Sequence, residues 1–249
     1  MRDYSRYHFR RKEVLQYFTE AILLTVLISY LFYSSIWAVW SFFLIFPLLL
    51  RVKGHQLLIR QRQRLTIEFQ ETISGAAAAL NAGYSIENAW KEAQKEVLQL
   101  YGEEALMYQE LQYMNAHIAM NISFEELLED FANRCQIEDV TSFCQVFLFA
   151  KRGGGDFNKI IKTTVERIGE KIKLQQELQT DLAARKLESR IMNLVPMGIL
   201  IYLNLTSPGY FQVLYHNPGG VCIMSLCLGV YLVAYEMSEK MLNIELWEA

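Results

Sequence analysis

The longest apolar stretch of the sequence lies near its beginning and limits what the chain can fold into. Between Val14 and Val52 the only formal charges are Glu20 and Arg51. A transmembrane helix needs about 20 predominantly apolar residues, and this stretch is nearly twice as long. It predicts two transmembrane helices, residues 15–33 and 36–52, that form a hairpin with a turn at Ser34-Ser35. A cleaved signal peptide has an apolar core of only about 7–15 residues and does not fit.

Two further apolar stretches lie near the end of the sequence. Ile191–Leu205 and Gly219–Tyr235 carry no formal charge, and neither does the connection between them. They predict a third transmembrane helix at residues 191–206 and a fourth at residues 219–236, joined by an external loop at 207–218. The sequence therefore predicts four membrane spans, followed by a tail at residues 237–249.

The basic residues predict the orientation of these spans. Lys and Arg cluster in the N-terminal segment 1–14, in residues 51–64 after the second span, and in residues 185–190 before the third. Flanking segments rich in Lys and Arg stay on the cytoplasmic side of a membrane. We therefore expect a multi-pass protein of the cytoplasmic (inner) cell membrane with both termini in the cytoplasm. Residues 53–190 then form a cytoplasmic domain, and its basic segments suit anionic membrane lipids.

The cytoplasmic domain has the apolar periodicity of helices. Apolar residues recur at intervals of three and four, and short turn signals divide the segment into six parts. The last of these parts has no helix-breaking residue between Asp156 and Pro196, so it predicts a long helix that continues into the third span. The predicted fold class is an all-α membrane protein with one cytoplasmic six-helix bundle between two pairs of transmembrane helices.

Gly153-Gly154-Gly155, directly before this long helix, resemble a phosphate-binding loop, but two features exclude that interpretation. A phosphate loop follows a strand and continues as Gly-Lys-Ser/Thr or as a dinucleotide-binding glycine pattern, and neither is present. Asp156 would also place a negative charge beside a phosphate. The predicted role is structural, because three connections share a turn residue followed by a helix-capping side chain. These residues are Gly83 with Ser85, Asn121 with Ser123, and Gly154 and Gly155 with Asp156.

Acidic residues dominate one part of the cytoplasmic domain. Between Glu87 and Asp139 there are 12 acidic and 3 basic residues. Such a surface can attract a basic partner, although charged residues are also found on surfaces that only contact water. The candidate partner-docking residues are Glu103, Glu104, Glu125, Glu126 and Glu129.

Few residues in the sequence have the spacing of a chemical site. The four cysteines form no Cys-x-x-Cys pair, the four histidines are scattered, and no paired carboxylates or nucleophile-base pattern is present. We therefore expect no catalytic residues, no cofactor and no metal. Glu20 is the one ionisable residue placed inside a predicted span, where it is either a contact for a basic residue of a neighbouring chain or a residue close enough to the membrane edge to reach water.

Four segments together resemble a known family. They are ISGAAAALNAGYSIENAWKEA (73–93), NISFEELLEDFANRCQIED (121–139), AKRGGGDFNKIIKTTVERI (150–168) and AARKLESRIMNLVPMGILIYL (183–203). This pattern is similar to the type II secretion system F domain family, in particular to the inner-membrane platform proteins of Tad (Flp) pilus systems.

The resemblance implies a non-enzymatic platform at the base of a type IV pilus or type II secretion machine. It implies three protein partners: a cytoplasmic secretion ATPase, pilin or pseudopilin subunits, and a sister platform protein or further copies of the same chain. Nucleic acid is not among them. The family positions matched include Arg134, for which an ion pair inside the bundle and a partner contact are the alternatives, and Pro196, a helix-modulating proline of the third span. From the residues alone, the alternative function is a small membrane transporter or channel subunit.

Overall fold

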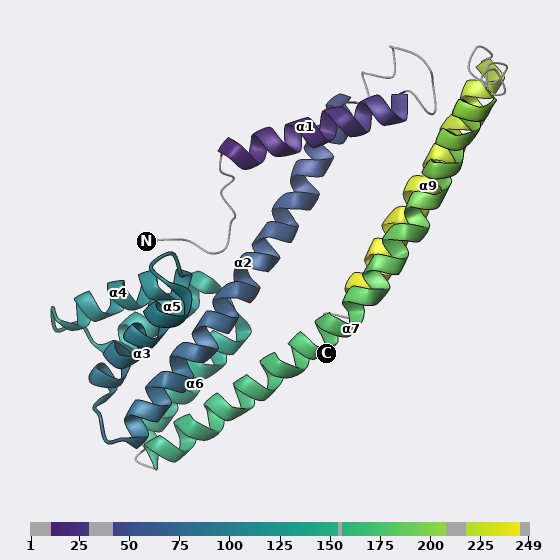
Figure 1. The fold of residues 1–249 in the computed structure, drawn as a ribbon. Helices are drawn as coiled ribbons and strands as arrows, with labels where there is room; N and C mark the ends of the chain where they lie inside the picture. Colours follow the sequence, from purple (N-terminus) through teal and green to yellow (C-terminus); the bar gives the residue numbers. More distant parts are fainter. Residues whose placement is uncertain (1–10, 30–41, 154–155, 208–217, 245–249) are drawn as a thin grey trace. The chain divides into compact units, whose positions relative to one another are not determined.

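The computed structural model describes residues 11–29, 42–153, 156–207 and 218–244, and these residues are almost entirely helical (Figure 1). No strand occurs in the described residues, so the prediction of an all-α chain is confirmed. The helices are α1 (Arg11–Ile28), α2 (Phe42–Asn81), α3 (Ile86–Tyr101), α4 (Leu106–Ile118), α5 (Phe124–Cys135), α6 (Glu138–Gly153), α7 (Phe157–Thr206) and α9 (Pro218–Ile244).

The prediction of four transmembrane helices is wrong. Within the described ranges, one helix is long and apolar enough to cross a membrane, the 20-residue segment Gly219–Ser238 of α9. The apolar part of α7 begins only after Arg190 and ends with the helix at Thr206, and it contains Asn193. That segment is shorter than the about 20 residues that a span requires.

The described parts of the first two predicted spans do not reach that length either. The apolar segment Val14–Leu27 of α1 is shorter than the about 20 residues of a span. Residues 42–50 of α2 precede Arg51, and residues 30–41 lie outside the described residues. The predicted turn at Ser34-Ser35 lies outside the described residues. The one candidate span does not support the prediction of a multi-pass protein, and the placement of both termini in the cytoplasm, inferred from the flanking Lys and Arg, stays a prediction.

The described chain separates into two compact units. The first, which we call the bundle, is formed by Gly54–Lys173 and contains the six helical segments that the sequence predicts. The second unit contains the described parts of residues 9–53 and 174–249. Helices α2 and α7 each contribute residues to both units, and α7 is continuous over 50 residues with Pro196 inside it.

The core of the bundle contains a series of aromatic contacts that joins four helices. Trp90 of α3 meets Phe124 of α5 with ring centroids 4.8 Å apart, and Phe124 meets Phe147 of α6 at 5.1 Å. Phe147 in turn meets Phe157, the first residue of α7, at 5.4 Å. All three contacts are edge-to-face, the arrangement that aromatic quadrupoles favour. The start of α7 is thereby fixed to the core.

The predicted helix caps are present where the structure describes them. The hydroxyls of Ser85 and Ser123 accept hydrogen bonds from backbone N–H groups three residues later, at 3.4 Å and 3.3 Å. The Asp156 carboxylate accepts one from the N–H of Lys159 at 3.2 Å. Each bond satisfies an N–H group that the first turn of a helix leaves free. Gly154 and Gly155 lie outside the described residues.

Gly83 shows why the end of α2 needs glycine. Its φ is +90°, a region that residues with a Cβ rarely adopt. Its N–H donates to the Leu80 carbonyl at 3.0 Å, and the next N–H, of Tyr84, donates to the Ala79 carbonyl at 3.1 Å. These two bonds close the helix as a Schellman motif and lead the chain towards Ser85.

In the second unit, α9 pairs with the C-terminal half of α7. The hydroxyls of Ser189 and Ser238 are 2.6 Å apart, and the Tyr231 hydroxyl donates to the Asn193 carbonyl at 2.8 Å. These two contacts run in opposite directions along the chain, so the helices are antiparallel. Most large apolar side chains of α9 lie outside this contact and are exposed, including Ile223, Leu226 and Val230, Leu232 and Val233.

Candidate partner-binding surfaces

The predicted docking glutamates lie on two elements of the bundle. Glu103 and Glu104 occupy the turn between α3 and α4, directly after Gly102, whereas Glu125, Glu126 and Glu129 lie on α5. The side chains of four of them are exposed, and Glu125 is half-buried. Four of the five therefore present carboxylates to solvent from two places on the bundle.

Glu125 differs from the other four because it has a partner within the bundle. It forms an ion pair with Lys151 of α6, which links α5 to α6. Burial alone would raise the pKa of Glu125, but the hydrogen bond from Lys151 and the charges of Lys151 and Arg152 hold this pKa below its ordinary value of 4.5. Its carboxylate is thus engaged in holding two helices together.

Arg134 forms an ion pair inside the bundle, which is one of the two alternatives that the sequence left open for it. Its guanidinium donates two hydrogen bonds to Glu110 of α4, at 3.1 Å and 2.7 Å, and one to Asp130 at 2.8 Å. The nearby Glu138 and Asp139, which are adjacent in sequence, instead face Lys171 of α7, with Nζ to oxygen distances of 3.7 Å and 2.8 Å.

The Arg134–Glu110 pair is largely removed from water. The Glu110 side chain is 6% exposed and that of Arg134 16%. Burial alone would lower the pKa of Arg134, but its hydrogen bonds to Glu110 and Asp130 raise that pKa well above its ordinary value. The fork of donors on arginine fits a carboxylate in this two-bond geometry. The pair therefore joins α4 to α5.

The sequence interpretation missed Glu68, the most buried carboxylate of the bundle. Its side chain is 1% exposed, accepts a hydrogen bond from Nε of Arg64 at 2.7 Å, and accepts another from the N–H of Met107 at 2.9 Å. A signal was present in the sequence, because Glu68 lies within the apolar stripe that contains Leu65 and Phe69. A carboxylate at a core-facing position of a helix needs such partners, because burying it without them costs several kcal/mol of folding free energy.

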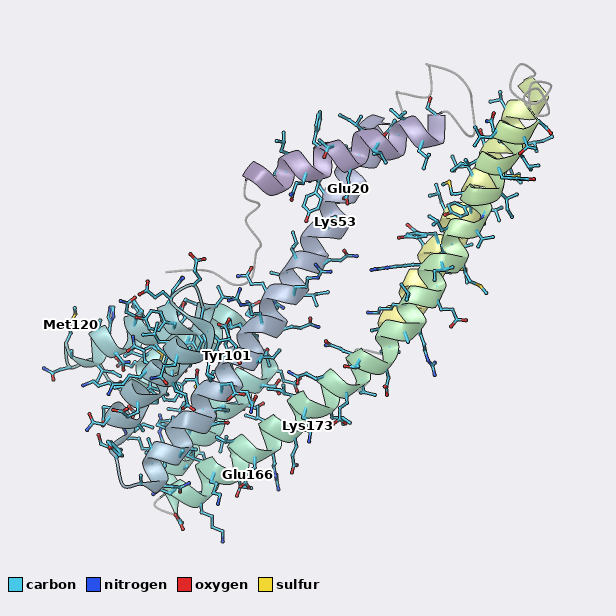
Figure 2. The ribbon with its side chains drawn as sticks, in the orientation of Figure 1. Glu20, Lys53, Tyr101, Met120, Glu166 and Lys173 are labelled. Atoms are coloured by element: carbon cyan, nitrogen blue, oxygen red, sulfur yellow. The ribbon has the colours of Figure 1, made fainter. Side chains whose placement is uncertain are left out.

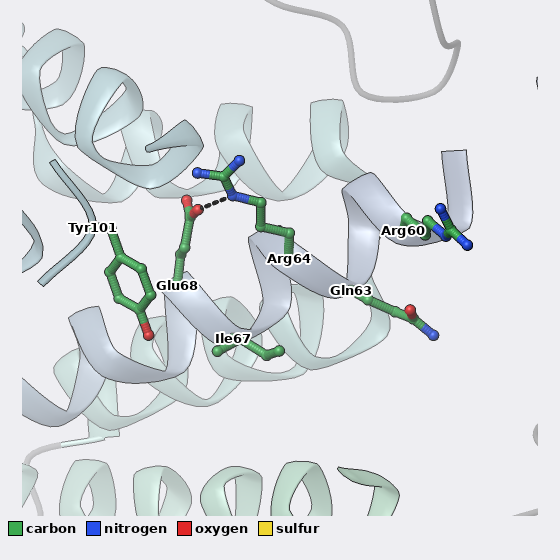
Figure 3. Close-up of a pocket in the computed structure, with 6 residues that line it drawn as sticks. All are labelled: Arg60, Gln63, Arg64, Ile67, Glu68 and Tyr101. Atoms are coloured by element: carbon green, nitrogen blue, oxygen red, sulfur yellow. Dashed lines mark hydrogen bonds and ion pairs between the residues drawn. The ribbon is translucent and has the colours of Figure 1, made fainter. Parts of the chain in front are cut away.

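An open pocket of about 300 Å³ lies beside Glu68 (Figure 3). Figure 3 shows Arg60 and Gln63 at one end of it and Tyr101 of α3 at the other, with Glu68 bonded to Arg64 between them. Burial raises the pKa of Tyr101, and the nearby carboxylates of Glu71 and Glu68 raise it further. Glu68 and Arg64 are thus paired with each other within α2, and the hydrogen bond from Met107 to Glu68 links α2 to α4.

Glu20 has a partner within its own chain. Its carboxylate lies 3.5 Å from Nζ of Lys53, which belongs to α2 and also lies over the ring of Tyr17 at 5.6 Å (Figure 2). The Glu20 side chain is 55% exposed. The contact joins α1 to α2 in the second unit, and it supplies the basic partner that the sequence interpretation looked for on a neighbouring chain.

Comparisons with known proteins gave no match. No protein-family model matches the sequence, no curated protein is similar to it, and no solved structure matches the fold. The described residues also contain no group of three or more His, Cys, Asp or Glu side chains arranged to hold a metal ion.

Proposed function

We propose that this protein is a non-enzymatic helical platform held at a membrane by α9, and that its bundle docks a partner ATPase. The observation that carries this proposal is the exposed acidic set Glu103, Glu104, Glu126 and Glu129, none of which forms an ion pair within the described residues. Exposed charge of one sign speeds the encounter with a partner of opposite charge and favours it over other partners.

The resemblance to the secretion F domain family supplies the identity of the partners in this proposal. The ATPase is a cytoplasmic secretion ATPase, and the platform transmits its work to pilin or pseudopilin subunits during filament assembly and protein secretion. A sister platform protein or further copies of this chain complete the assembly. The aromatic contact between Phe147 and Phe157 supports a transmitting role, because it fixes the start of α7 to the bundle core.

The membrane in this proposal is the cytoplasmic membrane, with the bundle on its cytoplasmic side. Support comes from the length of Gly219–Ser238 and from its exposed apolar side chains, which suit lipid chains better than water. Cys222 and Cys227 are exposed on this helix and report on its environment. In native membranes both thiols should resist a polar, membrane-impermeant maleimide and react once detergent unfolds the protein. Rapid labelling before detergent is added would show that α9 is not in a bilayer.

The docking proposal is tested by charge reversal and recovery of the ATPase. The double variant Glu103→Lys/Glu104→Lys and the single variant Glu129→Lys are compared with wild type in co-purification with a candidate secretion ATPase from the same organism. We expect recovery to fall at least about tenfold and the wild-type interaction to weaken with salt. Glu170→Lys, an exposed reversal on α7, serves as the matched control. Equal recovery from all variants would remove the acidic set as a docking surface.

A further inference from the structure

Helix α6 carries a large apolar side chain, Phe149, that the bundle does not cover. Its core-facing side chains are Val140, Phe143, Cys144, Phe147 and Ala150, all buried. On the opposite side Phe149 is 73% exposed, and Leu148 beside it is only half-buried. A surface helix normally has charged or polar residues opposite its core face. The exposed phenylalanine therefore calls for an explanation beyond the packing of the bundle.

A hollow lies directly against this phenylalanine. Its volume is about 370 Å³, and it is lined by Gln145, Leu148, Phe149, Arg152 and Gly153. These residues recur at the i, i+3, i+4, i+7 spacing of one helix face. Gly153 lines one part of the hollow and adds no side chain to it. The hollow has room for an apolar side chain from another molecule.

The charge beside the hollow is positive. Arg152 is exposed and forms no ion pair with any residue that the structure describes, whereas Lys151 is paired with Glu125. Arg152 is therefore the one charged side chain among the residues that line the hollow. Basic residues are favourable at the C-terminal end of a helix, which accounts for Arg152 but not for Phe149. Apolar surface and unpaired positive charge occur together at one place.

We propose that this face of α6, defined by Gln145, Leu148, Phe149, Arg152 and Gly153, binds an acidic amphipathic helix of a partner protein. Phe149 packs against aliphatic side chains of that helix, one of which enters the hollow, and Arg152 pairs with a carboxylate next to them. Arginine and phenylalanine are enriched in protein interfaces, and the spacing is that of a helix-on-helix contact. The occupant is acidic because an approaching basic helix would be repelled by Arg152.

The surface is distinct from the acidic set that the proposed function uses. Its charge has the opposite sign, and it lies on α6 rather than on α5 or the α3–α4 turn. The two proposals are therefore tested by different variants, and either can fail without the other.

The test measures binding of a designed helix to the full chain in phosphatidylcholine nanodiscs. The probe is a fluorescent peptide with Leu at i, i+3, i+4 and i+7 and Glu at its other positions, and a matched peptide carries Lys in place of Glu. Signal from empty nanodiscs is subtracted. The variants are Phe149→Ser and Arg152→Glu, with Met120→Ser as control, because Met120 is 69% exposed elsewhere on the bundle (Figure 2). Because both apolar positions are already exposed, these changes leave the core intact, which far-UV circular dichroism verifies.

We expect the Leu/Glu peptide to bind wild type and Met120→Ser equally, and Phe149→Ser to weaken its binding at least about tenfold. Arg152→Glu should also weaken binding of the Leu/Glu peptide and should improve binding of the Leu/Lys peptide. Equal binding of both peptides to wild type, or no effect of Phe149→Ser, would overturn the proposal. Sedimentation velocity of the same variants tests whether a second copy of this chain, rather than a partner helix, binds to this face. A dimer of wild type that Phe149→Ser dissociates would assign the face to a second copy of this chain and would equally overturn an acidic partner helix.

Discussion

Replacing Arg134 with methionine gives the sharpest test of how the bundle is held together. The change removes the guanidinium that forms two hydrogen bonds with Glu110, whose side chain is 6% exposed. The carboxylate is then left in the interior without its counter-charge. Breaking one side of a buried ion pair costs about 3–5 kcal/mol. The third bond, to the 47% exposed Asp130, adds only about 0–1 kcal/mol. We therefore expect Arg134→Met to lower the free energy of unfolding by about 4 kcal/mol.

The assay is urea unfolding followed through Trp90, which is fully buried in the bundle and changes its fluorescence when the bundle opens. The other three tryptophans are replaced by phenylalanine so that Trp90 is the reporter. With a urea m-value of about 2 kcal/mol per molar, a loss of about 4 kcal/mol lowers the unfolding midpoint by about 2 M. Asp130→Asn is the control and should shift the midpoint by less than about 0.5 M.

A double variant separates the pair from its surroundings. In Arg134→Met/Glu110→Leu neither charge remains, so the desolvation cost disappears together with the attraction, and stability should return to within about 1–2 kcal/mol of wild type. The reasoning would be refuted if Arg134→Met alone moved the midpoint by less than about 0.5 M. It would also be refuted if the double variant were destabilised by the sum of the two single effects.

Three further outcomes follow from the described geometry. Gly83→Ala should destabilise the bundle by about 1–2 kcal/mol in the same urea assay, because alanine is strained at a φ of +90°, and an unchanged midpoint would contradict the Schellman ending of α2. The pKa of Glu125 is lower in the folded state than in the unfolded state. Wild type should therefore be more stable than Glu125→Gln by its full margin above about pH 4.5, and this margin should shrink as the pH falls further. A margin that grows in acid would show that folding raises the pKa of Glu125 instead. Burial raises the pKa of the Cys135 and Cys144 thiols, so iodoacetamide should modify them at pH 8 only when urea opens the bundle, and modification of the folded protein at the rate of a free thiol would contradict their burial.

The helices and turns of the bundle were largely predictable because their signals are local. Ser85, Ser123 and Asp156 cap helices through bonds to N–H groups three residues away, so sequence alone predicts them. The partner of Arg134 was not predictable in the same way, because Glu110 lies 24 residues earlier and is brought near by the packing of α4 on α5. The same applies to Glu68, which satisfies an N–H group 39 residues away. Interactions of this kind depend on tertiary structure.

The error in the number of spans has a different origin. The prediction joined apolar residues into spans wherever formal charges were absent, and it gave little weight to helix ends and uncharged polar residues. The described apolar segment of α1, Val14–Leu27, is shorter than a span requires, and α7 carries Asn193 within its short apolar segment. A span needs both sufficient length and a high mean hydropathy, and among the described residues only Gly219–Ser238, which carries Glu236 near its end, has both.

The hydrogen bond from Met107 to Glu68 bears on the order in which the bundle forms. Helix α4 starts after Ala105, whose methyl group cannot cap a helix, and the carboxylate that replaces the missing cap comes from α2. A 13-residue helix is marginal by itself in water. Helix α4 therefore depends on α2 for its nucleation. A peptide of residues 103–119 should be mostly unstructured in solution, and α4 should gain protection from hydrogen exchange only at the stage of refolding when α2 is already in place.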